Sequence, residues 1–97
     1  MPMKIIELDL TDCKTPFDLH ERIRMAFRFP TTYGKNWSAF WDLLWSECDA
    51  DKVFVRGEHT LTSEFDEYRA KLHAILERNI TFRSENNLNP FSYEIID

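Results

Sequence analysis

Residues 32–45 contain the densest group of side chains suited to recognising another molecule. This stretch holds all three tryptophans of the chain and one of its two glycines. On a helical wheel of about 100° per residue, Trp41, Asp42 and Trp45 fall on one arc together with Ser38. Indole rings beside a carboxylate are typical of protein-binding hot spots. The alternative is that both tryptophans belong to the core and that Asp42 is simply solvated.

The sequence contains no group of residues that we would assign to catalysis. It has three histidines, but none has another His or Cys at metal-ligand spacing, which argues against a zinc site. We expect His20 to be a structural helix residue and His73 to be solvated, which leaves His59 as the one candidate for acid–base work. The sequence also lacks a phosphate-binding loop and a nucleophile motif. We therefore expect no enzyme activity, no metal and no cofactor.

The composition favours one small acidic domain over residues 1–97. The chain has 97 residues, of which 43% are hydrophobic and 14% aromatic, and this suffices for one core. Its formal net charge is −5, from 12 Lys and Arg against 17 Asp and Glu. Direct binding of nucleic acid is disfavoured, because it needs a basic surface to displace counterions. The charge fits a basic protein partner instead.

Neither a membrane segment nor a secretion signal is expected. No stretch approaches the roughly eighteen apolar residues that a membrane helix needs, and residues 1–7 introduce charge too early for a signal peptide. Cys13 and Cys48 have no motif spacing, so we expect reduced thiols, while a disulfide between them stays open. The sequence thus predicts a cytoplasmic protein that is a monomer when free.

Apolar alternation predicts three strands. Residues 4–10 alternate in part, which suits a strand covered on one side. Residues 52–56 are short and rich in Val and Phe, and they predict a buried central strand. Residues 91–96 alternate and predict the last strand, whereas residues 80–90 carry loop residues, with a short strand or packed turn at 80–82.

Capping residues predict the first and last helices. Thr15 can cap a helix that has Pro16 at its first position and ends before Pro30. Another helix is expected to begin near Ser63 and to end with Asn79 as the residue after its last turn. Strands alternating with helices in this order predict an α/β layer fold.

A helix over residues 37–47 is predicted between these two. Asn36 is a good N-cap for it, because its side-chain oxygen can accept a free backbone N–H. Gly34 is the expected turning point just before it, since glycine adopts positive φ without steric cost. The side chains expected on the core side of this helix are Trp37, Phe40 and Leu44.

Residues 30–44 resemble the signature of barstar and the barstar-like ribonuclease inhibitors. The shared pattern is Pro30-x-x-Tyr33-Gly34-x-Asn36-x-x-Ala39-x-Trp41-Asp42-x-Leu44, and Asp18-Leu19-His20 resembles the family's first helix. The resemblance implies a small three-layer α/β fold, with a three-stranded parallel sheet packed by helices. It also implies an intracellular inhibitor, or immunity protein, that occludes the active site of a cognate ribonuclease toxin.

The resemblance assigns a binding site as well. In the family, the acid that matches Asp42 enters the nuclease active site, and the tryptophan that matches Trp41 packs beside it. A carboxylate on a rigid helix can accept charge-assisted hydrogen bonds from the cations that otherwise hold RNA phosphate. The toxin-binding residues expected on this basis are Thr32, Tyr33, Asn36, Ser38, Trp41, Asp42, Trp45 and Glu77.

The sequence departs from the family pattern within this site. Thr32 stands where barstar has an aromatic residue, and Lys35 and Ser38 stand where it has acids. We therefore expect weaker electrostatic steering at this face and a cognate toxin that differs from barnase. Two alternatives stay open: an immunity protein for a toxin that is not a ribonuclease, and a general protein-interaction module using the same face.

Overall fold

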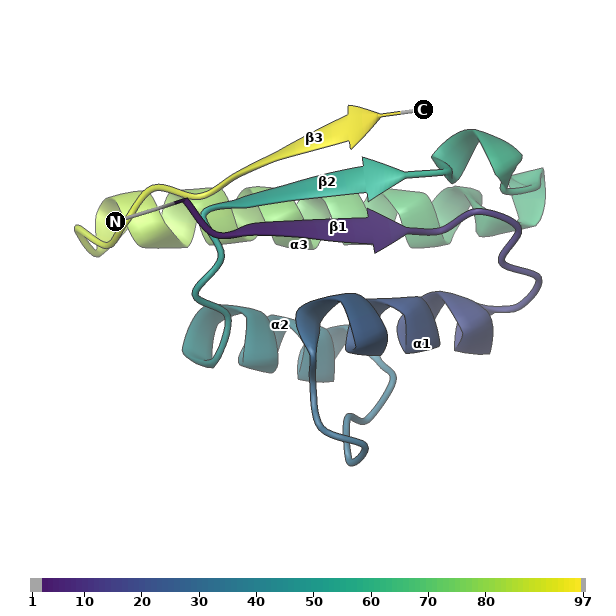
Figure 1. Cartoon of the computed structure of the whole chain (residues 1–97), viewed down its shortest axis with the longest axis horizontal. Coiled ribbons are helices and arrows are strands. Elements are labelled where there is room, and N and C mark those ends of the chain that lie inside the picture. Colours follow the sequence, from purple (N-terminus) through teal and green to yellow (C-terminus); the bar gives the residue numbers. More distant parts are fainter. Residues whose placement is uncertain (1–2, 97) are drawn as a thin grey trace.

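Three short strands form a parallel sheet in the order β1-β2-β3 (Figure 1). The computed structural model describes residues 3–96, and within them β1 spans Ile5–Asp9, β2 spans Lys52–Arg56 and β3 spans Ser92–Ile96. β2 pairs in parallel with both neighbours. The prediction of a central strand is confirmed, but β2 is buried on one face only: Val53 and Val55 have no exposed surface, whereas Arg56 is exposed.

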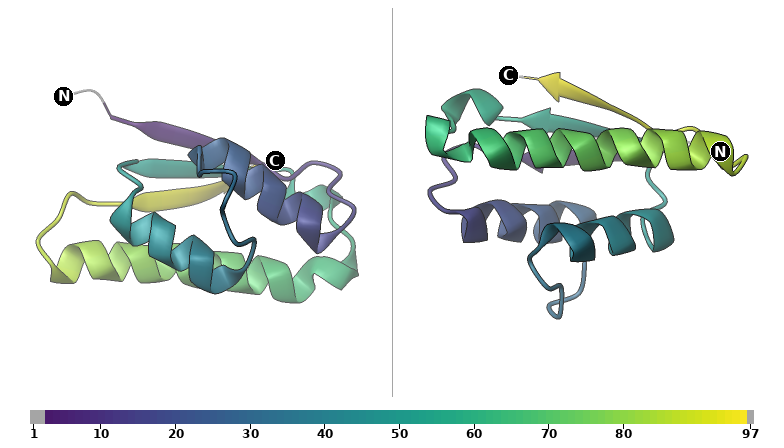
Figure 2. Two further views of the ribbon diagram at one scale, coloured as in Figure 1. Left: turned by 90° about the horizontal axis from the view of Figure 1, so that it is seen from below. Right: turned by 180° about the vertical axis from the view of Figure 1, so that it is seen from behind.

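The three helices of residues 3–96 cover one face of this sheet, as Figure 2 shows. α1 (Pro16–Phe27) packs on β1, and α3 (Asp66–Glu85) packs on β3. α2 (Trp37–Ser46) packs on α3 instead of on a strand. The layers are therefore the sheet, then α1 and α3, and then α2, which confirms the predicted three-layer α/β fold.

The core lies between the sheet and the helices. Leu8 and Val55 point from the sheet toward the helices, because alternate residues of a strand face opposite sides. The helices meet them with apolar residues spaced three or four positions apart, which places those residues on one helix face. These are Leu19 and Ile23 of α1, Phe40 and Leu44 of α2, and Leu72 and Leu76 of α3.

The start of α1 is a complete capping box, and its N-cap is Thr15, as predicted. The backbone N–H of Asp18 donates to Thr15 Oγ1 at 3.1 Å, and the backbone N–H of Thr15 donates to Asp18 Oδ2 at 3.2 Å. The helix ends at Phe27, and Arg28 follows in the left-handed conformation with φ of 58°. The predicted end before Pro30 is therefore confirmed.

α3 is longer than its sequence indicated. The predictions that it ends at Asn79 and that residues 80–82 form a strand or turn are wrong, because the helix continues to Glu85. Contacts distant in sequence hold these last turns. The Arg83 guanidinium donates to the carbonyl oxygen of Cys48 at 2.9 Å and lies 5.4 Å from the centroid of the Phe91 ring.

The connection from β2 to α3 is fixed by a glycine and a buried acid. Gly57 has φ of 84°, and a Cβ there would lie 2.3 Å from Thr11 Oγ1, so only glycine fits. The next residue, Glu58, is buried, and its Oε2 lies 2.7 Å from His73 Nε2. His73, which was expected to be solvated, is 35% exposed at its side chain and shares one hydrogen bond with Glu58.

The side chain of Asn79 supplies a test of the α3 packing. Asn79 has no exposed surface, and neither its amide nitrogen nor its amide oxygen has a hydrogen-bond partner in the described chain. A buried amide without partners costs about 1–3 kcal/mol. We expect Asn79→Leu to raise the free energy of unfolding by up to about that amount, as measured by urea denaturation. The control is Asn89→Leu, at an exposed side chain without a hydrogen bond in the described chain, and a destabilised Asn79→Leu with unchanged Asn89→Leu would contradict this account.

Candidate functional site

The turn before α2 is shaped by its capping residue. Asn36 Oδ1 accepts a hydrogen bond from the backbone N–H of Ala39 at 2.8 Å, which confirms the predicted N-cap. The prediction of positive φ at Gly34 is wrong, since positive φ occurs at Lys35, with a value of 53°. A Cβ at Gly34 would lie 3.1 Å from Asn36 Nδ2, so the glycine leaves room for the capping side chain.

Lys35 ties this turn to α1. Its Nζ lies 3.5 Å from Glu21 Oε2 and 5.1 Å from the centroid of the Phe17 ring. Hydrogen bonds from Arg24, together with the charges of Arg24 and Lys35, lower the pKa of the Glu21 carboxyl. Ion pairs between partly exposed side chains such as these add little stability. Their effect here is to orient the turn against the first helix.

Tyr33 is buried beneath the turn. Its hydroxyl lies 2.8 Å from His20 Nδ1, and the two groups share a hydrogen bond. The His20 ring lies 4.6 Å from the Trp37 ring, centroid to centroid. Burial raises the pKa of Tyr33, whereas burial and the charge of Lys35 lower the pKa of His20. His20 is thus the structural residue that was expected, and the Tyr33 ring positions the turn from within the core, where a partner cannot reach it.

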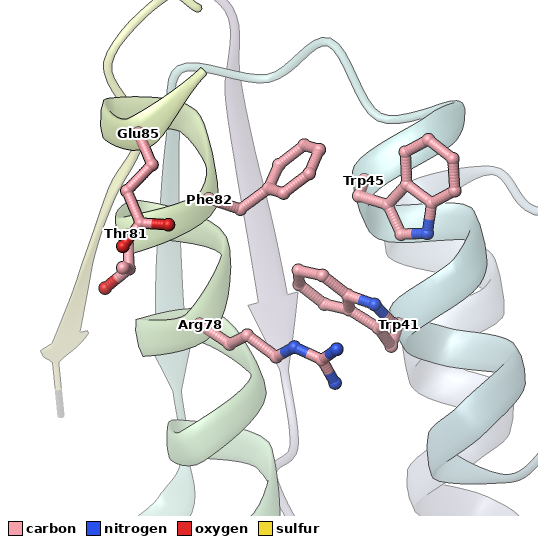
Figure 3. Close-up of a pocket in the computed structure, with 6 residues that line it drawn as sticks. All are labelled: Trp41, Trp45, Arg78, Thr81, Phe82 and Glu85. Carbon is pink, nitrogen blue, oxygen red and sulfur yellow. The ribbon is translucent and has the colours of Figure 1, made fainter. Parts of the chain in front are cut away.

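The two remaining tryptophans of α2 form one wall of a slot against α3 (Figure 3). The rings of Trp41 and Trp45 each lie 5.8 Å from the ring of Phe82. The guanidinium of Arg78 lies 4.1 Å from the centroid of the Trp41 ring, in a cation–π contact. The slot has a volume of about 310 Å³, and its lining residues are Trp41, Trp45, Arg78, Thr81, Phe82 and Glu85.

The outer arc of α2 is accessible beside this slot. Trp45 is 47% exposed, Ser38 and Asp42 are exposed, and Trp41 is half-buried. The alternative that both tryptophans are simply core is therefore wrong for Trp45. The carboxylate of Asp42 has no hydrogen-bond or ion-pair partner within residues 3–96. A free acid thus stands next to an exposed indole on one rigid helix.

The structure places Glu77 apart from this arrangement. The Tyr93 hydroxyl donates to Glu77 Oε1 at 2.8 Å, so Glu77 faces β3, while the slot lies on the side of α3 that faces α2. One residue along a helix is a rotation of about 100°, which separates Glu77 from Arg78. The acid of α3 that lines the slot is Glu85.

Four slot residues are absent from the sequence-based prediction, all of them on α3. Arg78, Thr81, Phe82 and Glu85 share one helix face, and their spacing of three and four residues is a readable signal. The signal is hidden when the helix is expected to end at Asn79, because three of the four residues then fall outside it. The prediction of the α3 boundary therefore limits the prediction of the site.

The charges around the slot are mixed. The basic Arg78 and the acidic Glu85 line the slot, and the acidic Asp42 lies on the neighbouring helix α2. Charges of opposite sign on one surface offset each other's long-range field, which salt screens further beyond about 8 Å. The site therefore offers local, geometrically defined charges rather than one broad acidic surface.

The sequence comparison agrees with this fold and this helix. The chain matches the family described as Barstar (barnase inhibitor) over residues 3–94. It belongs to the barstar family. The resemblance of residues 30–44 is thereby confirmed, and the predicted lack of enzyme activity follows, because members of the barstar family are inhibitors. Among curated proteins, none matches the chain significantly.

Residues 3–96 show no metal cluster and no membrane-spanning helix. No three His, Cys, Asp or Glu side chains there converge as a metal site would require. Cys13 and Cys48 are both free thiols, and burial raises the pKa of each. None of the helices in this part of the chain has the length and apolar character needed to span a bilayer.

The N-cap of α2 can be tested by substitution. We expect Asn36→Ala to lower the free energy of unfolding by about 1 kcal/mol, because the N–H of Ala39 loses its acceptor. Urea denaturation measures the effect, and Asn36→Asp, which keeps a capping oxygen, is the matched control. Equal stability of Asn36→Ala and wild type would show that this cap does not hold the start of the helix.

The buried His20 predicts a dependence of stability on pH. Its pKa is lowered in the folded state, so the unfolded chain binds a proton first as the pH falls below about 6.5. Stability is therefore retained above that pH and decreases below it. We expect His20→Gln to reduce the slope of unfolding free energy against pH between about 6.5 and 5. Identical slopes for His20→Gln and wild type in urea denaturation would contradict the assignment.

Proposed function

We propose that this protein inhibits a ribonuclease toxin by placing Asp42 in the toxin's active site. The single observation that carries the proposal is the exposed, unpaired carboxylate of Asp42 on a rigid helix beside the exposed Trp45. The family description supplies the class of partner, a ribonuclease such as barnase. A net charge of −5 supports a basic partner, and we keep the expectation that binding occurs in the cytoplasm.

The chemistry of inhibition is competition for cations. A ribonuclease holds the phosphate of its substrate with positively charged side chains, and a carboxylate can accept charge-assisted hydrogen bonds from the same groups. The site excludes water around that contact when Trp45 packs against the toxin surface. RNA is then kept out because the acid and the flanking indole occupy its place.

The neighbouring residues take different roles in this proposal. Thr32, Asn36 and Ser38 are accessible at the turn and the start of α2, and they serve as contacts at the rim of the interface. Tyr33 positions the turn from within the core, and Glu77 stays outside the interface. No nucleic acid is bound directly by this protein in the proposed mechanism.

Arg78 gives the proposed interface a second, opposite charge. Its guanidinium is stacked on Trp41, and it has no ion-pair partner in the described part of the chain. A planar guanidinium held in one orientation loses little entropy when its edge donates to an acceptor. We therefore expect the toxin to present a carboxylate or carbonyl oxygen opposite Arg78, and this requirement would distinguish its cognate toxin from other ribonucleases.

Substitution of Asp42 tests the proposed function. We expect Asp42→Asn to weaken inhibition by about 2–5 kcal/mol, or roughly 30-fold to several-thousand-fold, because toxin cations lose their counter-charge. Charge pairs of this strength are known from the barnase–barstar complex itself, so the range is borrowed from this family. RNA cleavage by purified ribonuclease toxins, beginning with barnase, measures the inhibition.

The control is Asp12→Asn, which removes the same charge at the connection between β1 and α1. It should inhibit as wild type does. Equal inhibition by Asp42→Asn and wild type would remove Asp42 from the active site of the toxin. Tight binding to a toxin whose RNA cleavage continues unchanged would favour the alternative of a target that is not a ribonuclease.

A further inference from the structure

The face of the sheet that no helix covers carries nine side chains in a regular grid. The pairing register places Phe54 at its centre, with Glu7 of β1 on one side and Glu94 of β3 on the other. Lys52 and Arg56 precede and follow Phe54 along β2. The three rows are Ile5, Lys52 and Ser92, then Glu7, Phe54 and Glu94, then Asp9, Arg56 and Ile96.

This grid has an ordered pattern of charge and apolar surface. The two bases flank Phe54 along its own strand, and the two acids flank it on the neighbouring strands. Ile5, which is 51% exposed, and Ile96 occupy opposite corners. A shallow hollow joins them, lined by Ile5, Glu7, Phe54, Arg56 and Ile96. Within one chain, Arg56 Nη2 lies 2.8 Å from Glu7 Oε1, and Lys52 Nζ lies 3.9 Å from Glu94 Oε2.

We propose that this face binds a second copy of the chain about a two-fold axis along the Ile5–Phe54–Ile96 diagonal. Such an axis places each of these three apolar residues against its own copy. The same rotation brings Lys52 to Glu7 of the second copy and Arg56 to Glu94 of the second copy. Every charge on these four positions then meets an opposite charge.

The other diagonal of the grid is less favourable. An axis through Asp9, Phe54 and Ser92 would place Asp9 directly against Asp9 of the second copy, and like charges in contact are destabilising. It would also move Ile5 and Ile96 off the axis. That axis would still bring Lys52 to Glu94 and Arg56 to Glu7 of the second copy, so the contact between the two copies of Asp9 is what distinguishes the two orientations.

Sheet dimensions make this orientation feasible. Strands lie about 4.8 Å apart and residues on one face about 6.7 Å apart, so the chosen diagonal is inclined by about 35° to the strands. The strands of the two copies then cross at about 70°, near the orthogonal class of sheet packing.

The contact area is small. The face measures roughly 14 by 17 Å, and its area is well below the about 800 Å² that each partner buries in a stable complex. The dimer is therefore weak, and the chain remains a monomer at low concentration.

Charge reversal in two separate variants tests the dimer. We expect wild type to self-associate in sedimentation equilibrium at concentrations up to about 1 mM and near-physiological salt. Lys52→Glu alone and Glu7→Lys alone should each weaken association at least tenfold, since each creates two like-charge contacts across the axis. An equimolar mixture of the two variants should recover association, because each contact between positions 52 and 7 then joins an acid of one copy to a base of the other.

The controls keep each outcome decisive. Lys14→Glu changes the net charge equally at an exposed site outside the sheet, and it should associate as wild type does. Thermal unfolding shows that each variant is folded, and Lys52→Gln replaces Lys52→Glu if the latter unfolds. A wild-type chain that is monomeric at all concentrations would overturn the proposal. So would equal effects of Lys52→Glu and Lys14→Glu, or a mixture that fails to recover association.

Discussion

A series of aromatic contacts joins the end of α1 to α2, and the position of the proposed binding site depends on it. The Phe27 ring lies 5.3 Å from Phe29 and 5.5 Å from Phe40, and Phe29 lies 5.4 Å from Tyr33. α2 packs on α3 and on these rings, whereas the strands support α1 and α3. Packed rings of this kind add about 0.5–1.5 kcal/mol per pair beyond their burial. The helix that carries Asp42 is therefore placed by side chains.

The proposed binding site combines rigid support with exposed polar and aromatic side chains. Asn36 fixes the first turn of α2, and Lys35 and Tyr33 hold the preceding residues from two sides. On the other flank, Phe82 of α3 supports both tryptophans of the slot. An interface prepared in this way loses little conformational entropy on binding. In the proposed complex, this local order would offset the weaker long-range attraction of a site with mixed charges.

The sequence predicted most of the fold because the relevant signals were local. Thr15 and Asn36 mark helix starts by hydrogen bonds to their own neighbours, and Pro16 does so by its fixed backbone angle. A short β-branched and aromatic run marks residues 52–56 as a central strand. The end of α3 could not be predicted in this way. Its last turns are held by the contacts of Arg83 with Cys48 and Phe91, which are distant in sequence or separated by a loop.

The candidate site shows the same difference between local signals and contacts distant in sequence. Trp41, Asp42 and Trp45 were found from one helical wheel, because a single helix carries them. The buried place of Tyr33 depends on its contact with His20 across 13 positions of sequence, which no local pattern reports. The slot depends on α2 and α3 together, so Arg78 and Phe82 appear as site residues only when both helices are placed.

α2 is joined to the rest of the fold by side chains and not by backbone pairing with the sheet, and this determines how substitutions affect its position. A ladder of hydrogen bonds fixes each strand to within a residue, but a helix seated on side chains can tilt when a ring changes size. A substitution at Phe27 or Phe29 can therefore change the angle at which α2 presents its carboxylate, while the sheet is left intact. In this architecture the orientation of the Asp42 carboxylate can change independently of the sheet that keeps the chain folded.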